Sequence, residues 1–233
     1  MTPRALIFAF LLISPRLAVA QVGHDPASSP YRTLRYGQFL GLTGGYIGGS
    51  GGSIGVAPHQ GEVVGIRYEF LGTGTVTVGL EGAVARLQRN IVDAYKPIDT
   101  GRTGPFDQNV TFAQLVLQFN LTGGKSWHGI APFVSSGAGL AIVSKNAADT
   151  SGFKFRTKFA LTPSLGARIF LSPRLVLRVE ARSLFWQITY PDIYRRPPVT
   201  DPTKNPVITG SIKEWTTPGW YQVGLSYAFH RPF

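Results

Sequence analysis

The chain has 233 residues with no cysteine, 28 glycines and 17 prolines, and only 15% of its residues are charged. An ordinary soluble domain is about 25% charged, so part of this surface is expected to face something other than water. The absence of cysteine excludes disulfides, thiol catalysis and cysteine metal sites, and no apolar run of about 18 residues follows residue 20, which excludes transmembrane helices. The net charge of +11 needs its own explanation.

The first 20 residues have the pattern of a secretory signal peptide. Arg4 precedes the apolar run 5–13, and Ala18-Val19-Ala20 offers a small-x-small cleavage site before Gln21. The run is too short to span a bilayer as a helix, so the alternative of a retained anchor is disfavoured. We expect residues 1–20 to be removed and residues 21–35, which are polar and contain Pro26 and Pro30, to form a short periplasmic lead-in.

Eight segments of the remaining chain alternate between apolar and small or polar residues, which is typical of strands with two different faces. In the second, Val64, Ile66 and Tyr68 share one face while Arg67 and Glu69 share the other. The predicted strands are 36–48, 61–70, 75–88, 109–121, 129–144, 156–170, 175–189 and 222–229.

Connections between these segments alternate in length. Turns after the second, fourth and sixth strands are short, whereas 48–60, 89–108, 145–155 and 190–214 are long. Short turns at one end and long loops at the other indicate an outer-membrane barrel with both ends of the chain in the periplasm. The glycine-rich run 44–55 has no phosphate-binding pattern and is expected to be flexible. A soluble lipocalin-like barrel is the alternative, but its water-facing side would consist mainly of Gly, Ala, Ser and Thr.

All charges near the middle of the predicted strands fall on the small-residue faces. Because an ionisable group at membrane depth must face the lumen and find a partner, we expect one buried ion network. Its members are Arg67, Glu69, Glu81, Arg168, Arg178, Glu180 and Arg182, accompanied by Gln114 and Gln118. Eight strands enclose an interior just wide enough for side chains, so the network is expected to plug the lumen. A catalytic carboxylate at Glu81 or Glu180 is the alternative, but no histidine or nucleophile shares a face with either.

No motif in the sequence indicates a cofactor, a metal site or a nucleic-acid module. Gly124-Lys125-Ser126 lacks the earlier glycine of a phosphate-binding loop, and the four histidines have no ligand spacing. We therefore expect a monomeric protein that is not an enzyme.

The positive surplus is concentrated on the long-loop side. The cations there are Arg86, Arg89, Lys96, Arg102, Lys145, Lys154, Arg156, Lys158, Arg195, Arg196, Lys204 and Lys213. They are either solvated loop charges or a collar that contacts the anionic phosphates of outer-membrane lipid and lipopolysaccharide.

The last strand carries the one recognisable motif. Residues 222–229 resemble the C-terminal signal read by the barrel assembly machinery, with a polar residue at Gln222, a glycine at Gly224 and aromatics at Tyr227 and Phe229. Such proteins usually stop at the final aromatic, whereas this chain continues as a short tail, 230–233.

Taken with the strand pattern, the chain resembles small outer-membrane barrels of the outer membrane protein A type without their periplasmic domain. The expected fold is an all-β, eight-stranded, antiparallel up-and-down transmembrane barrel over 36–229, in a Gram-negative outer membrane. A structural or surface-interaction role is expected, and a small-solute channel or a lipid-modifying enzyme is the alternative.

Overall fold

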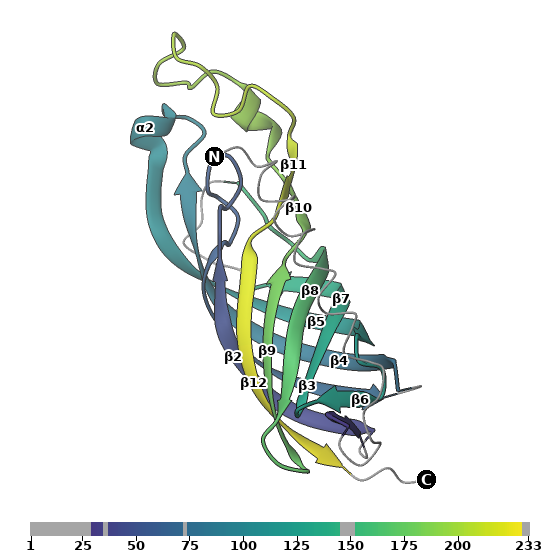
Figure 1. Ribbon diagram of the computed structural model, residues 1–233. Helices are drawn as coiled ribbons and strands as arrows, with labels where there is room; N and C mark the ends of the chain where they lie inside the picture. Colours follow the sequence, from purple (N-terminus) through teal and green to yellow (C-terminus); the bar gives the residue numbers. More distant parts are fainter. Residues whose placement is uncertain (1–28, 35–36, 72–73, 145–151, 230–233) are drawn as a thin grey trace, which may run out of the picture.

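The computed structural model describes residues 29–34, 37–71, 74–144 and 152–229, and its dominant feature is a closed sheet (Figure 1). The predicted signal peptide, the predicted tail 230–233 and most of the predicted lead-in lie outside the described residues. Within the described residues, no helix has the length and apolarity needed to cross a membrane.

The wall of the barrel consists of eight long strands. They are β2 (Gln38–Gly48), β3 (Gln60–Leu71), β4 (Val76–Val92), β5 (Arg102–Asn120), β7 (Ile130–Val143), β8 (Lys158–Phe170), β9 (Leu175–Ser183) and β12 (Gly219–Phe229). Each pairs antiparallel with its neighbour, and β12 returns to β2, with Phe229 opposite Gln38 and Gly219 opposite Gly48. The wall therefore has no free edge, and the predicted eight-stranded antiparallel barrel is confirmed.

The outer face of this wall is apolar. Because side chains alternate along a strand, every second residue points outward, and large apolar residues such as Leu42, Val64 and Leu165 are more than 60% exposed. Aromatic residues border this band: Tyr46 lies opposite Tyr221 toward the long loops, and Tyr227 lies with Phe229 toward the short turns. An apolar band between aromatic girdles is the pattern of a barrel surrounded by lipid.

Two strands extend much further than the sequence predicted. The expected loop 89–108 is wrong over most of its length, because β4 continues to Val92 and β5 begins at Arg102, with the one-turn helix α2 (Ile98–Gly101) between them. At the start of this extension and within it, outward residues such as Arg86, Gln88 and Asp107 are polar, so the apolar alternation that marks a lipid-facing strand is absent there.

The predicted strand 175–189 divides into two. β9 ends at Ser183, and β10 (Trp186–Thr189) leaves the barrel wall to pair with β11 (Lys213–Thr216). The chain between β10 and β11 contains the 3-10 helix η4 (Asp192–Arg195) and lies at the top of the molecule in Figure 1.

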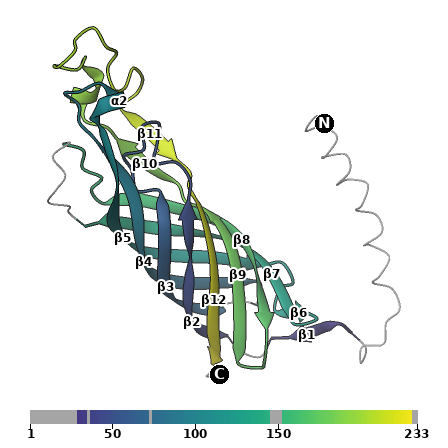
Figure 2. The same ribbon diagram turned by 90° about the vertical axis from the view of Figure 1, so that its left-hand side faces the viewer.

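A pair of short strands extends the barrel sheet at the opposite end. In the predicted lead-in, β1 (Tyr31–Thr33) pairs with β6 (Lys125–Trp127), which follows the short turn after β5 (Figure 2). This part of the lead-in is thus a strand that docks beside the short turns.

Candidate functional site: a filled lumen and a folded cap

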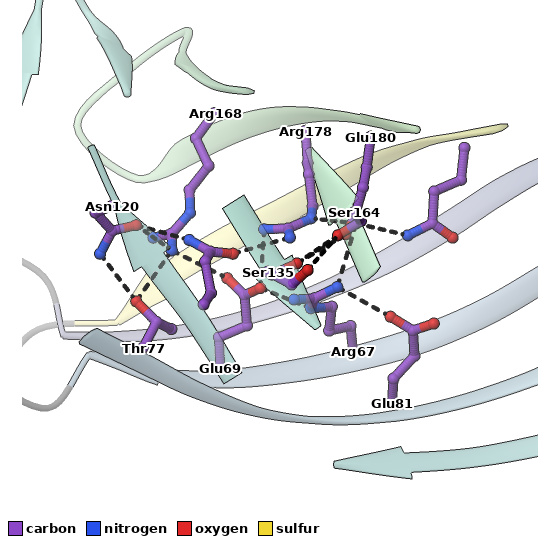
Figure 3. A network of polar contacts seen from close by, with 12 residues as sticks. Arg67, Glu69, Thr77, Glu81, Asn120, Ser135, Ser164, Arg168, Arg178 and Glu180 are labelled. Carbon is purple, nitrogen blue, oxygen red and sulfur yellow. Dashed lines mark hydrogen bonds and ion pairs between the residues drawn. The ribbon is translucent and has the colours of Figure 1, made fainter. Parts of the chain in front are cut away.

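The lumen contains a network of buried ion pairs, shown in Figure 3. Arg67 on β3 lies with Nε 2.6 Å from Glu69 Oε1 and with one terminal nitrogen 3.1 Å from Glu81 Oε2. Glu81 also accepts two hydrogen bonds from Arg182, at 2.5 and 2.6 Å. Since β3, β4 and β9 supply these side chains, the network connects opposite parts of the wall.

Glu180 is the most heavily used acceptor in this network. Its Oε2 lies 3.0 Å from nitrogens of Arg178 and Arg182 and 3.2 Å from Arg67, and it accepts a hydrogen bond from Gln222 at 2.9 Å. Its Oε1 accepts hydrogen bonds from Ser164 and Ser135. One carboxylate therefore joins strands from both sides of the barrel, and neither oxygen is available to a ligand.

Arg168 completes the set of seven residues toward the short turns. A terminal nitrogen donates to Thr77 Oγ1 and to Asn120 Oδ1, both at 3.1 Å, and lies 3.8 Å from Glu69 Oε2. Four arginines and three glutamates leave one excess positive charge, which these neutral oxygens help to solvate.

Aromatic rings cover the arginine planes. The guanidinium of Arg178 lies 4.0 Å from the ring centre of Phe133, that of Arg182 lies 4.6 Å from Trp220, and that of Arg168 lies 4.9 Å from Phe39. Such cation–π contacts are worth about 2 kcal/mol when desolvated. They fill the space that the ion pairs leave open.

The structure thus brings all seven predicted lumen residues together. Gln118 accepts a hydrogen bond from Arg178, and Gln114 accepts one from Thr162. Gln222, Ser135 and Ser164 join the network without having been predicted as members, although the two-residue period places each on the inward face of its strand.

Above the ion network, the lumen is apolar. Phe112 on β5 stacks on Trp186 with ring centres 6.0 Å apart and contacts Trp220 at 5.1 Å. Trp186 also meets Phe155 edge-on at 4.9 Å. Because Trp220 covers the guanidinium of Arg182, the aromatic layer lies directly against the charged layer.

This apolar layer continues into the long loops, which fold over the barrel. We call this part the cap: residues 49–59, residues 89–102, residues 152–157 and residues 184–218. Its buried apolar side chains belong to the same cluster as the lumen aromatics, and they include Ile54, Val56, Val92, Phe153, Tyr194 and Ile208. The lumen and the cap therefore share one hydrophobic core.

Hydrogen bonds join the parts of the cap. Tyr194 Oη donates to the carbonyl of Val92 at 2.9 Å, and the amide of Asn90 donates to Gly55 at 2.9 Å. The expectation that the glycine run 44–55 is flexible is not matched by this packing. At Gly52, with φ of +83°, an added Cβ would lie 2.5 Å from both Ile188 and Tyr190.

A carboxylate fastens the first loop to the β10–β11 hairpin. Both oxygens of Glu214 accept hydrogen bonds from the Ser53 amide, at 3.0 and 3.1 Å, and Tyr190 Oη donates to Oε2. Burial alone would raise the pKa of Glu214, but the hydrogen bonds from Tyr190 and Ser53 outweigh it and hold the pKa below its ordinary value. Burial and the adjacent Glu214 raise the pKa of Tyr190.

The attachment of the first loop is expected to weaken in acid. Because the pKa of Glu214 is lowered in the folded state, its contribution is present above its ordinary pKa and is lost as the pH falls through the lowered value. The exchange protection factor of the Ser53 amide, which corrects for the intrinsic effect of pH, should fall several-fold across that range. Glu214→Gln should remove most of this pH dependence, and an equally steep dependence in that variant would contradict the assignment.

The predicted cationic collar is only partly at the surface. Arg89 is buried at 3% exposure beside Phe153 and donates to the carbonyl of Val56, so its assignment as a loop charge is wrong. Arg89 lies on the inward face of β4, as Leu87 does, and its side chain therefore enters the cap. Arg86 pairs with Asp107 and Lys96 pairs with Asp93, so an acid neutralises each of these two cations. Lys145 lies outside the described residues.

Two residues of the predicted assembly signal also have contacts in the folded barrel. Gln222 binds Glu180, and an added Cβ at Gly224 would lie 2.8 Å from Thr43 Cγ2. Tyr227 and Phe229 face outward instead, with ring centres 5.2 Å apart. No group of three or more histidine, aspartate or glutamate residues in the described part of the chain could hold a metal ion.

No protein-family model matches this chain, and no curated protein sequence does. Solved structures do. The outer membrane protein OprG from Pseudomonas aeruginosa is 14% identical, with a TM-score of 0.55, over 85% of this chain and 99% of its own. Neisserial surface protein A is 12% identical, with a TM-score of 0.51, over 86% and 98%. The fold is therefore that of the small eight-stranded outer-membrane barrels, and the predicted outer-membrane location agrees with it.

Proposed function

We propose that this protein is a non-enzymatic outer-membrane barrel, closed to solute flow, that presents its folded cap at the cell surface to lipopolysaccharide or to a partner. The observation that carries this proposal is that two successive layers, one charged and one aromatic, fill the lumen. A solute would have to pass the Arg67–Glu81–Glu180 network and then the Phe112–Trp186–Trp220 layer.

The two alternatives from the sequence have less support. A channel needs a continuous polar path, whereas the upper layer of this lumen is aromatic. A lipid-modifying enzyme needs a reactive group that can reach lipid, whereas Glu81 and Glu180 each accept hydrogen bonds from arginine inside the barrel. The outer face offers lipid mainly apolar side chains.

Planar-bilayer recording of the refolded protein tests the closure. We expect no steady conductance beyond rare, small openings, because paired long side chains and stacked rings leave little continuous water in an eight-stranded barrel. A porin added to the same bilayers verifies the recording, and heat-modifiable migration verifies that the barrel is folded. A stable, anion-selective channel would instead favour transport, since the lumen carries an excess of arginine.

A further inference from the structure

The chain entering β8 alternates aromatic and basic residues. Phe153 and Phe155 are buried in the cap core, at 3% and 4% exposure, while Lys154 between them and Arg156 after them are exposed. Lys158 follows two residues later at the start of β8 and is half-buried. The two phenylalanines thus fix the backbone that carries these cations.

The backbone changes face at Arg156. By the two-residue period of a strand, Phe153, Phe155 and Phe159 would share one face, but Phe159 is 58% exposed and points outward. Arg156 has φ of +58°, a left-handed conformation that non-glycine residues rarely adopt. The switch lets Phe159 face outward while the preceding phenylalanines stay in the core.

Nothing in the described structure neutralises these three cations. None of Lys154, Arg156 and Lys158 forms an ion pair with a described residue, and no acid occurs in 129–144 or 152–170, the segments that form β7 and β8. Arg156 is close enough to Lys158 for the two charges to repel each other. The distal part of the cap differs, because Arg195, Arg196 and Lys204 share their loop with Asp192 and Asp201.

Lys154 and Arg156 lie just beyond the point where the apolar outer face of β8 ends, and Lys158, which has the inward parity of the buried Ala160, stays partly exposed beside them at the rim of the strand. Phe159 is opposite Leu140 of β7, and both are exposed on the wall, as is Ile142 further along β7. Figure 2 shows β7 and β8 running from this end of the barrel toward the short turns. In a barrel placed in the outer membrane as proposed, this is the level of the outer-leaflet phosphates.

We propose that Lys154, Arg156 and Lys158 bind the phosphate groups of an outer-leaflet glycolipid, and that Phe159 contacts its acyl chains. This inference rests on the proposed surface role and makes it specific: the lipid contact is on the β7–β8 side of the barrel, next to the membrane, and not on the tip of the cap. The fixed backbone and the closely spaced like charges favour a multiply charged anion.

The test measures binding of fluorescent bisphosphorylated lipid A to the refolded full chain in detergent micelles. The variant K154Q/R156Q/K158Q is compared with R195Q/R196Q/K204Q, which removes the same charge from the distal cap. We expect the first to bind on the order of 100-fold more weakly and the second to bind within about twofold of the original chain, as the usual attraction per cation near an anionic surface implies.

Further arms make the result decisive. Because the backbone at Arg156 is unusual, K154Q/K158Q is measured too, and it should bind at least about tenfold more weakly while migrating as a folded barrel. Lipid A without phosphates should bind poorly, and millimolar inorganic phosphate should not displace the bisphosphorylated form. Equal losses in both triple variants, unchanged binding in the first, or full displacement by inorganic phosphate would each overturn the site. Bilayer conductance is independent of all these outcomes, so failure of this site and failure of the closed barrel can be told apart.

Discussion

Replacing Glu180 with leucine is expected to destabilise the barrel by about 3–5 kcal/mol, the usual cost of removing one partner from a buried ion network. The carboxylate lies against Arg67, Arg178 and Arg182 in the lumen. Its removal raises the excess positive charge there from one to two and leaves the hydroxyls of Ser135 and Ser164, which also bond to each other, without their carboxylate acceptor. Leucine fills a similar volume, so a cavity contributes little to the expected loss.

Urea unfolding in micelles measures this effect, and Glu62→Leu is the matched control. Glu62 lies on the exposed outer face of β3, in the same strand as Glu69, so the same chemical change there should alter the free energy of unfolding by less than about 0.5 kcal/mol. If Glu180→Leu and Glu62→Leu unfold at the same urea concentration as the original chain, the network does not stabilise the barrel.

Replacing Tyr227 and Phe229 together with alanine should abolish most assembly in cells. These residues match the C-terminal assembly signal, but in the folded barrel they face outward, where they contact each other and Tyr227 accepts a hydrogen bond from Arg174 at 3.0 Å. Loss of an aromatic pair costs about 0.5–1.5 kcal/mol beyond its burial, so the refolded variant should remain a stable barrel. In cells it should accumulate in the periplasm or be degraded.

The control is Tyr46→Ala with Tyr221→Ala, which removes an outward aromatic pair from the opposite girdle. Heat-modifiable protein in outer-membrane fractions is the measurement. The control should assemble at close to the original level while the terminal variant does not. Original levels of inserted protein in the terminal variant would rule out recognition through these two side chains.

The membrane part of the fold and the residues of the lumen network could be predicted from the sequence because lipid and lumen impose opposite chemistry on alternate residues. Val64, Ile66 and Tyr68 are apolar where the wall faces outward, and Arg67 and Glu69 lie between them. Where a strand leaves the apolar band, that contrast disappears. The sequence therefore predicted a loop where β4 and β5 extend beyond the apolar band.

The cap could not be predicted for a related reason. Ile54, Phe153 and Tyr194 come from three separate loops, each with too few apolar residues to show a period of its own. Their burial depends on contacts between segments that are far apart in sequence. One example is the hydrogen bond that Tyr194 donates to the carbonyl of Val92, 102 residues earlier in the chain. The inward path of Arg89 was missed in the same way, because its partners lie in other segments.

The shared core of lumen and cap limits how this protein can vary. Surface loops of a barrel ordinarily accept insertions and deletions freely, because few contacts depend on them. Here Ile54, Val56, Ala57, Phe153 and Phe155 lie in loops but belong to the interior, and Gly52 has no room for a side chain. Sequence change should therefore be confined to exposed stretches such as the one around Val199, which is 70% exposed. An inserted epitope would be tolerated there, whereas in the first loop it would enter the core of the barrel.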